Sequence, residues 1–185
     1  MDKEKIEELK YKRLKLQEEV RLKNLIERVA SQIAYLEKLG ESYFVFYEFE
    51  NLNWINSNVR IRNRDGYNGI HGDFQIDIED SNAKSSINIS EEEINSEKFN
   101  EQFLSFISTE SNIMVCYQGG DPELEISAKA FLDKPTEFFA RPETWLLTTD
   151  KKRIIEYIWE QGVIRFILLE ESTPILVKLI IIEEK

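Results

Sequence analysis

The only histidine in this sequence, His71, lies in a glycine-rich segment between an arginine and an aspartate. Imidazole titrates near neutral pH, and metal-free RNA cleavage can run on one histidine together with a carboxylate and an arginine. One hypothesis is therefore a metal-independent ribonuclease or nucleotide-handling enzyme centred on His71, Arg64 and Asp73. The alternative is a hairpin loop in which the glycines supply positive φ angles and the histidine is simply exposed.

The sequence is poor in ligands for metals and cofactors. One histidine and one cysteine, Cys116, exclude a zinc site built from these residue types, and a single cysteine cannot form an internal disulfide. The glycines near His71 lack the strand–GxGxxG–helix context of a phosphate-binding loop, and no GK[ST] motif occurs. Asp121, Glu123 and Glu125 lie close together, but their alternation is typical of a solvated strand edge. We expect no metal and no cofactor.

Three consecutive cations, Lys151, Lys152 and Arg153, follow Asp150. We expect them in the first turn of a helix over residues 150–162, because an aspartate is a good N-cap and the following apolar residues recur at helical spacing. Backbone N–H groups and three cations together would bind an anion or an acidic side chain. The alternative is that neighbouring carboxylates neutralise the cluster.

Charge divides the chain into two regions. Residues 1–39 hold ten Lys and Arg against eight Asp and Glu, whereas residues 40–185 hold 14 against 27. The second region is thus strongly acidic. Such a surface repels nucleic acids and anionic membranes, and it attracts a basic protein surface.

We therefore expect a small acidic protein-binding module, acting as an immunity-like or anti-defence-like inhibitor of a basic, nucleic-acid-processing partner. Acidity that serves only solubility is the alternative. The expected contacts are carboxylates and two exposed aromatic anchors: Asp73, Asp77, Glu79, Asp80, Glu91, Glu92, Glu93, Tyr67 and Trp54.

Residues 1–39 predict a long amphipathic helix, because they contain neither Gly nor Pro after Asp2 and Gly40 stands at the expected C-cap. The apolar stripe is strong in the second half only, so we expect that half to pack on the body and the first half to be solvated. The repeat of Leu22, Val29 and Leu36 at seven residues favours a second interpretation, a coiled-coil homodimer and an adaptor role.

Residues 40–185 predict a single acidic α+β domain, with about six to eight mostly antiparallel strands and two or three helices. The strands at 59–64 and 73–79 alternate apolar and charged residues, as expected for a hairpin. Ser90 and Glu93 form the pattern of a capping box. Further strands are expected at 43–49, 113–118, 124–130 and 144–147, and an antiparallel pair at 163–169 and 175–182.

The sequence favours a cytoplasmic location. The segment Met-Asp-Lys-Glu-Lys at residues 1–5 is followed by no apolar stretch of the kind found in secretory signals. The most apolar run, residues 175–182, is too short to cross a bilayer.

Overall fold

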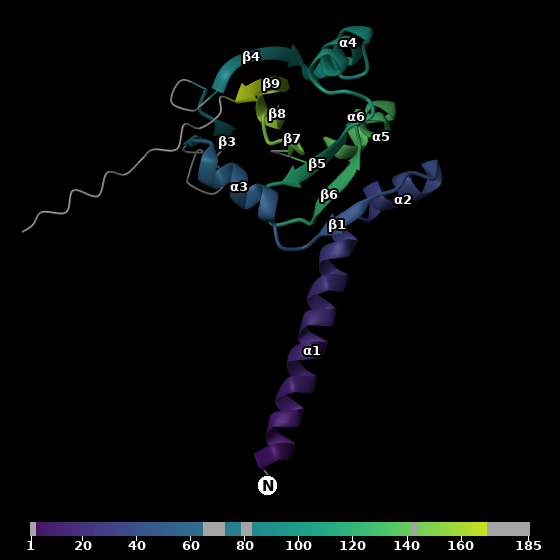
Figure 1. The fold of residues 1–185 in the computed structure, drawn as a ribbon, viewed down its shortest axis with the longest axis vertical. Helices are drawn as coiled ribbons and strands as arrows, with labels where there is room; N and C mark the ends of the chain where they lie inside the picture. Colours follow the sequence, from purple (N-terminus) through teal and green to yellow (C-terminus); the bar gives the residue numbers. More distant parts are fainter. Residues whose placement is uncertain (1–2, 65–72, 79–82, 142–143, 170–185) are drawn as a thin grey trace, which may run out of the picture.

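The computed structural model describes residues 3–64, 73–78, 83–141 and 144–169, and the chain has the α+β architecture expected from its sequence (Figure 1). Seven antiparallel strands form one sheet in the order β1-β6-β5-β7-β8-β9-β4, and β2 and β3 form a separate hairpin. The strands are β1 (Phe44–Phe46), β2 (Ile61–Arg64), β3 (Asp73–Ile76), β4 (Ala83–Ser90), β5 (Asn112–Tyr117), β6 (Glu123–Ser127), β7 (Thr144–Thr148), β8 (Arg153–Ile158) and β9 (Val163–Leu169). The helices are α1 (Lys3–Arg28), α2 (Ala30–Leu39), α3 (Glu50–Asn58), η1 (Glu91–Glu93), α4 (Glu97–Phe106), α5 (Ala128–Asp133), α6 (Pro135–Phe138) and η2 (Trp159–Gln161).

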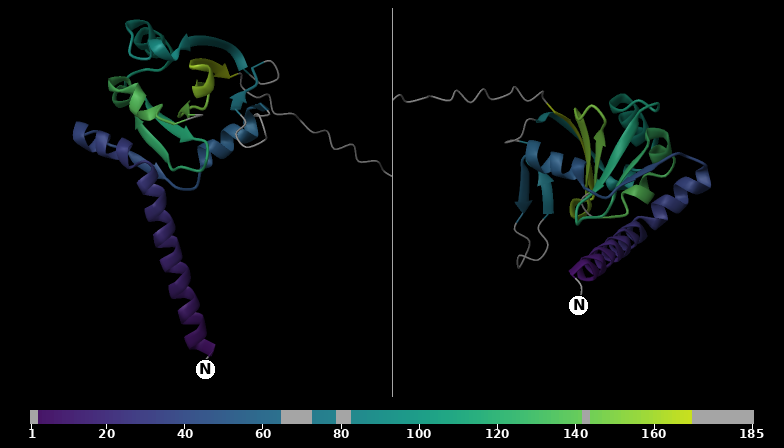
Figure 2. Two further views of the ribbon diagram at one scale, coloured as in Figure 1. Left: turned by 180° about the vertical axis from the view of Figure 1, so that it is seen from behind. Right: turned by 60° about the horizontal axis from the view of Figure 1, so that its bottom comes forward.

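The N-terminal helix is interrupted at Val29, whose backbone is not helical, so that α1 and α2 follow one another. Val29 and Leu36 are fully buried in the core, and Gly40 ends α2 in the left-handed conformation expected of a C-cap. The second half of this helical arm packs on the body, the side chains of its first half are mostly exposed, and α1 projects away from the body (Figures 1 and 2). The seven-residue seam is therefore occupied by the protein's own core at Val29 and Leu36 and is not open there to a partner helix.

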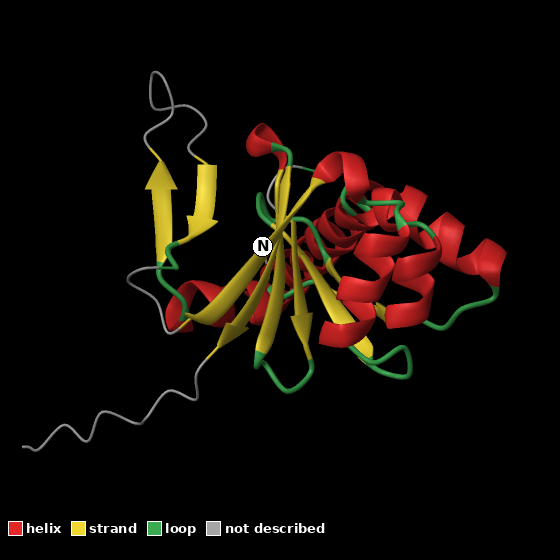
Figure 3. Ribbon diagram, turned by 90° about the horizontal axis from the view of Figure 1, so that it is seen from above, coloured by secondary structure: helices red, strands yellow, loops and turns green. Residues whose placement is uncertain are grey.

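The central strands are covered on both faces, as shown in Figure 3. Helices α2, α4, α5 and α6 pack on one face, and α3 with the β2–β3 hairpin packs on the other. Side chains of β5 alternate between the two cores, with Val115 and Tyr117 on the first face and Met114 and Cys116 on the second. Two-sided burial explains why these strands are apolar at nearly every position.

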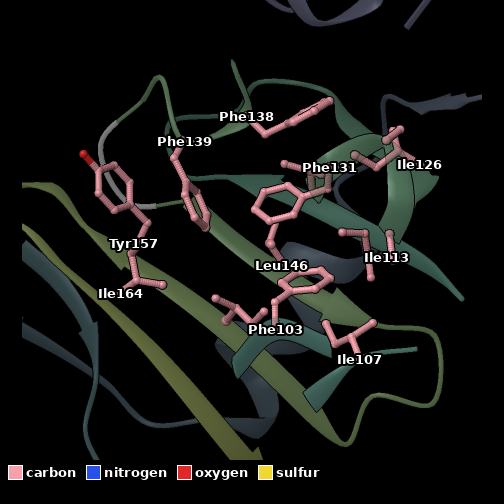
Figure 4. Packing of buried hydrophobic residues seen from close by; sticks show 14 of the residues in the cluster. Phe103, Ile107, Ile113, Ile126, Phe131, Phe138, Phe139, Leu146, Tyr157 and Ile164 are labelled. Carbon is pink, nitrogen blue, oxygen red and sulfur yellow. The ribbon is translucent and has the colours of Figure 1, made fainter. Parts of the chain in front are cut away.

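Phenylalanine dominates the core under the helices (Figure 4). The ring of Phe131 stacks on Phe103, with centroids 5.2 Å apart, and meets Phe139 edge-on at the same distance. Phe139 in turn stacks on Tyr157 of β8 at 5.0 Å. These contacts bind the short helices α5 and α6 to the sheet, because aromatic pairs add stabilisation beyond the apolar area that they bury.

The helix expected over residues 150–162 is wrong. Arg153–Ile158 is strand β8, in the middle of the sheet, and only Trp159–Gln161 forms a short 3-10 turn. Ile154 and Ile155 point to opposite faces and are both buried, so the helical spacing reflects burial on two sides of a strand.

The expected antiparallel pairing of residues 163–169 with residues 175–182 is also wrong, because both edges of the first segment are occupied by other strands. Strand β9 is bonded to β8 along one edge and to β4 along the other, over its whole length. No edge of β9 is left for another strand, and residues 175–182 lie outside the described part of the chain. Strand β4 had no strong sequence signal because its exposed side carries Ser86, Asn88 and Ser90.

Several local predictions are confirmed. The expected hairpin forms between β2 and β3, and Ser90 and Glu93 make both hydrogen bonds of a capping box. The pairs β5–β6 and β5–β7 match the strands expected at 113–118, 124–130 and 144–147, although Ala128 already begins α5. The strand expected at 43–49 is limited to Phe44–Phe46, and α3 follows it.

Candidate protein-binding surface

The predicted site residues near the β2–β3 hairpin are only partly within the described structure. His71, Tyr67, Glu79 and Asp80 lie outside it. The hairpin register places Arg64 directly opposite Asp73, so the backbone does bring these two positions together. The acid–base role proposed for the histidine stays a prediction.

Two residues expected at a partner surface have structural positions instead. Asp77 is buried, and its backbone N–H donates a hydrogen bond to the carbonyl oxygen of Arg60. Trp54 on α3 is half-buried against the second core, and the Nζ atom of Lys151 lies 5.2 Å from its ring centroid.

No helix begins at Lys151, Lys152 and Arg153, so the helix N-terminus on which the expected anion site depended is not formed there. Lys151 and Lys152 lie in the β7–β8 turn, where Lys151 has a φ of 56°, and Arg153 begins β8. The Asp150 carboxylate accepts hydrogen bonds from the Thr148 hydroxyl (2.5 Å) and the backbone N–H of Lys152 (3.0 Å), and it lies 3.6 Å from the Arg153 guanidinium. The turn is thus held around a carboxylate.

The carboxylates at 121, 123 and 125 each bind protein groups. Asp121 is buried and pairs with Arg28 at the end of α1 (3.1 Å) and with Arg141. Glu125 accepts a hydrogen bond from the Asn112 amide. Asp121 therefore fixes α1 to the body where the helix breaks, and in the described residues no group of His, Cys, Asp or Glu could hold a metal ion.

Glu123 is a buried cap for a helix from another part of the chain. Its carboxylate accepts hydrogen bonds from the backbone N–H groups of Asn51 (3.2 Å) and Leu52 (2.6 Å) and from the Asn51 side chain (2.9 Å). The first N–H groups of a helix have no partner within the helix, and Phe49 at the N-cap has no side-chain acceptor. Glu123 of β6 supplies that acceptor and positions α3 on the sheet.

An acidic and aromatic surface lies where the capping-box turn η1 meets η2. The backbone N–H of Glu91 donates to the Gly162 carbonyl (2.7 Å), and the Tyr157 hydroxyl donates to the Glu91 carboxylate (2.5 Å). These bonds bring η1 to the residues on either side of η2, in which Trp159 is 58% exposed. We call this the η1–η2 surface; its members are Glu91, Glu92, Glu93, Trp159 and Glu160.

The negative charge of the η1–η2 surface does not come from Glu93. The Lys98 ammonium bonds both carboxylate oxygens of Glu93 and lowers the pKa of that group despite some opposing desolvation, so this ion pair adds no net charge. Glu92 and Glu160 are exposed. An exposed apolar ring on the same surface as exposed carboxylates is suited to a partner that presents a basic surface with an apolar recess.

Sequence reasoning identified Glu91, Glu92 and Glu93 but missed Trp159. The tryptophan falls within residues 150–162, for which a helix was expected that does not form. A usable signal was present, since Gly162 follows Trp159 within a short polar break between two apolar runs.

The described residues also line a hollow of about 520 Å³ at the opposite end of the sheet. Its walls come from the C-terminal end of α4 and the β7–β8 turn, and they are rich in hydroxyl groups. The lining contains no histidine or cysteine, and its one carboxylate, Asp150, is engaged by the turn. Nothing in this arrangement resembles an activated nucleophile.

The architecture places this chain among α+β proteins with a helical arm. Comparison with known proteins found no family model and no curated protein that matches it. No helix among the described residues combines the length and the apolar character needed to cross a membrane.

Proposed function

We propose that this protein is an acidic binding module that recognises a basic protein through the η1–η2 surface. The observation that carries the proposal is the exposed Trp159 of η2 at the end of the sheet to which the Glu91 hydrogen bonds also bring three consecutive glutamates. Tryptophan is one of the residue types enriched at the energetic centres of protein interfaces.

The partner class follows from charge. Residues 40–185 hold 27 Asp and Glu against 14 Lys and Arg, and this excess costs self-repulsion in the folded protein. Proteins that process nucleic acids present basic surfaces, so an acidic module can associate with them quickly and cover that surface. The proposed activity is inhibition of such a partner, of the immunity or anti-defence kind.

Capture from the native host tests the proposal. The wild-type chain and the variants Trp159→Ala and Glu92→Lys are immobilised and exposed to the same extract, and the bound proteins are identified and quantified. We expect a basic protein whose yield drops at least about tenfold with Trp159→Ala, because an interface tryptophan is typically worth more than 1.4 kcal/mol.

Two matched controls lie at the other end of the sheet. Leu104→Ala removes an exposed apolar side chain, and Glu110→Lys makes the same charge change as Glu92→Lys. Both should retain the partner. Equal loss in all four variants, or none in any, would show that the η1–η2 surface has no binding role.

A further inference from the structure

The outer part of α1 is a basic helix with uncovered apolar side chains. Residues 5–15 hold five Lys and Arg against two Glu, the reverse of the balance in the body. Leu9, Tyr11 and Leu14 are each more than half exposed on this stretch. A projecting helix with exposed apolar residues gains little stability from its own fold, because most helical stability comes from packing of one face.

An acidic groove lies at the root of the same helix. It has a volume of about 440 Å³ and runs between α1 and the segment around β1. One wall carries Glu18, Arg21 and Leu22 of α1, and the other carries Phe46, Glu48 and Glu50. The Arg21 guanidinium pairs with the Glu18 carboxylate at 2.8 Å, so the excess negative charge of the groove rests on Glu48 and Glu50. Glu48 and Glu50 are exposed, so the open side of the groove is negative.

Strand β1, which borders this groove, is an edge strand of the sheet. It is the last strand on its side of the main sheet, bonded only to β6 among the described strands. Phe44 on its outward face is 61% exposed. An exposed aromatic edge of this kind is commonly covered in a native assembly.

The groove cannot be filled by the outer part of its own α1. Residues 5–15 continue in the same helix that supplies Glu18, Arg21 and Leu22 to the groove wall, and they point away from the body (Figure 2). A helix of 26 residues is about 39 Å long, which is enough to extend well beyond the body and reach another molecule.

We propose that residues 5–15 of α1 dock in the acidic groove of a second copy of this chain, and that the second copy does the same in return. Basic side chains such as Lys10 then face Glu48 and Glu50, while Tyr11 and Leu14 cover apolar parts of the groove and of the partner's α1. The exchange is reciprocal, so it closes as a two-fold dimer with the two α1 helices antiparallel. It is independent of the η1–η2 surface.

A charge-swap experiment tests this arrangement with the full chain. The groove variant carries Glu48→Lys and Glu50→Lys, and the arm variant carries Lys5→Glu, Lys10→Glu and Arg13→Glu. Mass is measured by sedimentation at matched concentrations. Wild type should have twice the monomer mass, and each variant alone should be monomeric, because its arm and groove carry like charges.

The mixture of the two variants gives the decisive result. The basic arm of the groove variant fits the acidic groove of the arm variant, and the acidic arm fits the basic groove, so an equimolar mixture should restore the dimer mass. Glu92→Lys with Glu97→Lys, a control with the charge change of the groove variant, should remain dimeric. Circular dichroism and a thermal melt confirm that each variant is folded.

Three outcomes would overturn the proposal. A wild-type chain that is monomeric at high micromolar concentration has no such interface. A groove variant that stays dimeric shows that the arms pair without the groove. Two folded variants that remain monomeric when mixed show that the charge pairing is not the one proposed.

Discussion

Glu156 of β8 and Arg165 of β9 form a buried ion pair that also holds the β2–β3 hairpin against the sheet. The two residues are direct neighbours across the strands, and the Arg165 Nε atom donates to the Glu156 carboxylate at 2.8 Å. The same carboxylate accepts from the Ile76 backbone N–H (2.8 Å) and the Trp145 indole (3.1 Å), and Arg165 donates to the Ile76 carbonyl. Burial raises the pKa of Glu156, although Arg165 and the hydrogen bonds oppose this shift.

Glu156→Gln should lower the free energy of unfolding by about 3 kcal/mol, because it leaves the Arg165 charge without its counter-ion in the interior. Urea denaturation measures the loss. The double variant Glu156→Leu with Arg165→Met should lose less than Glu156→Leu alone, since it removes both charges together. If the loss in the double variant equals the sum of the losses in Glu156→Leu and Arg165→Met, the two residues are not energetically coupled.

Glu123→Ala should destabilise the protein by about 2 kcal/mol, because two backbone N–H groups at the start of α3 lose their acceptor in a buried place. The matched control is Glu125→Ala on the same strand, where the half-buried carboxylate bonds only a side-chain amide and the loss should stay under about 1 kcal/mol. Hydrogen exchange should also rise in Glu50–Asn58 in the first variant. Equal effects in both variants would contradict the capping role.

The Asp121→Asn variant should loosen α1 without unfolding the body, because the pairs with Arg28 and Arg141 lose their charge. Trypsin cleavage after Arg28 should become several-fold faster, while the urea midpoint changes little. Asp133→Asn is the control, since Asp133 accepts a hydrogen bond from Tyr35 of α2, away from the helix break at Arg28. If the rate of trypsin cleavage is unchanged, the apolar contacts of Val29 and its neighbours are sufficient to hold the arm on the body.

Asp150 should add a small, pH-dependent stabilisation. Partial burial works to raise its pKa, but the hydrogen bonds from Thr148 and Lys152 and the nearby Arg153 outweigh it, so the pKa is lowered. A lowered pKa in the folded state means that the contribution is present above about pH 4 and is lost as the pH falls through the folded value. The site is partly exposed, so Asp150→Asn should cost less than about 1 kcal/mol at pH 7. Its difference from wild type should vanish in acid; a difference that persists there would contradict the linkage.

Local signals in the sequence predicted local structure well. The capping box at Ser90 and the C-cap at Gly40 depend on a few neighbouring residues and were correct. The amphipathic stripe predicted the packed half of the arm for the same reason. Strand β8 failed because a strand buried on both faces has no alternation, and its isoleucines then fit a helical period equally well.

The candidate surface was only half predictable. Glu91, Glu92 and Glu93 were evident as a run of charge. Trp159 became part of it only because the hydrogen bond between Tyr157 and Glu91, which are 66 residues apart, brings the end of β8 to η1. The buried roles of Glu123 and Glu156 were invisible for the same reason, because each depends on groups that are distant in sequence.

The last prediction concerns the rate at which the proposed partner associates. If the acidic surface steers a basic partner, the association rate constant should decrease as salt rises towards physiological strength, where the screening length is about 8 Å. Glu92→Lys should slow association further at low salt while leaving the melt unchanged, because that side chain is exposed and removing its charge weakens attraction. Glu110→Lys changes the net charge equally at the far end of the sheet, and should have the smaller effect if the η1–η2 surface is the contact.

Trp159→Ala should instead raise the dissociation rate constant, because a side chain that becomes buried in the complex stabilises it only after the two proteins have met. Stopped-flow or surface-plasmon kinetics separate the two rates. If the association rate constant responds to neither salt nor Glu92→Lys, the negative charge of this protein serves only its solubility.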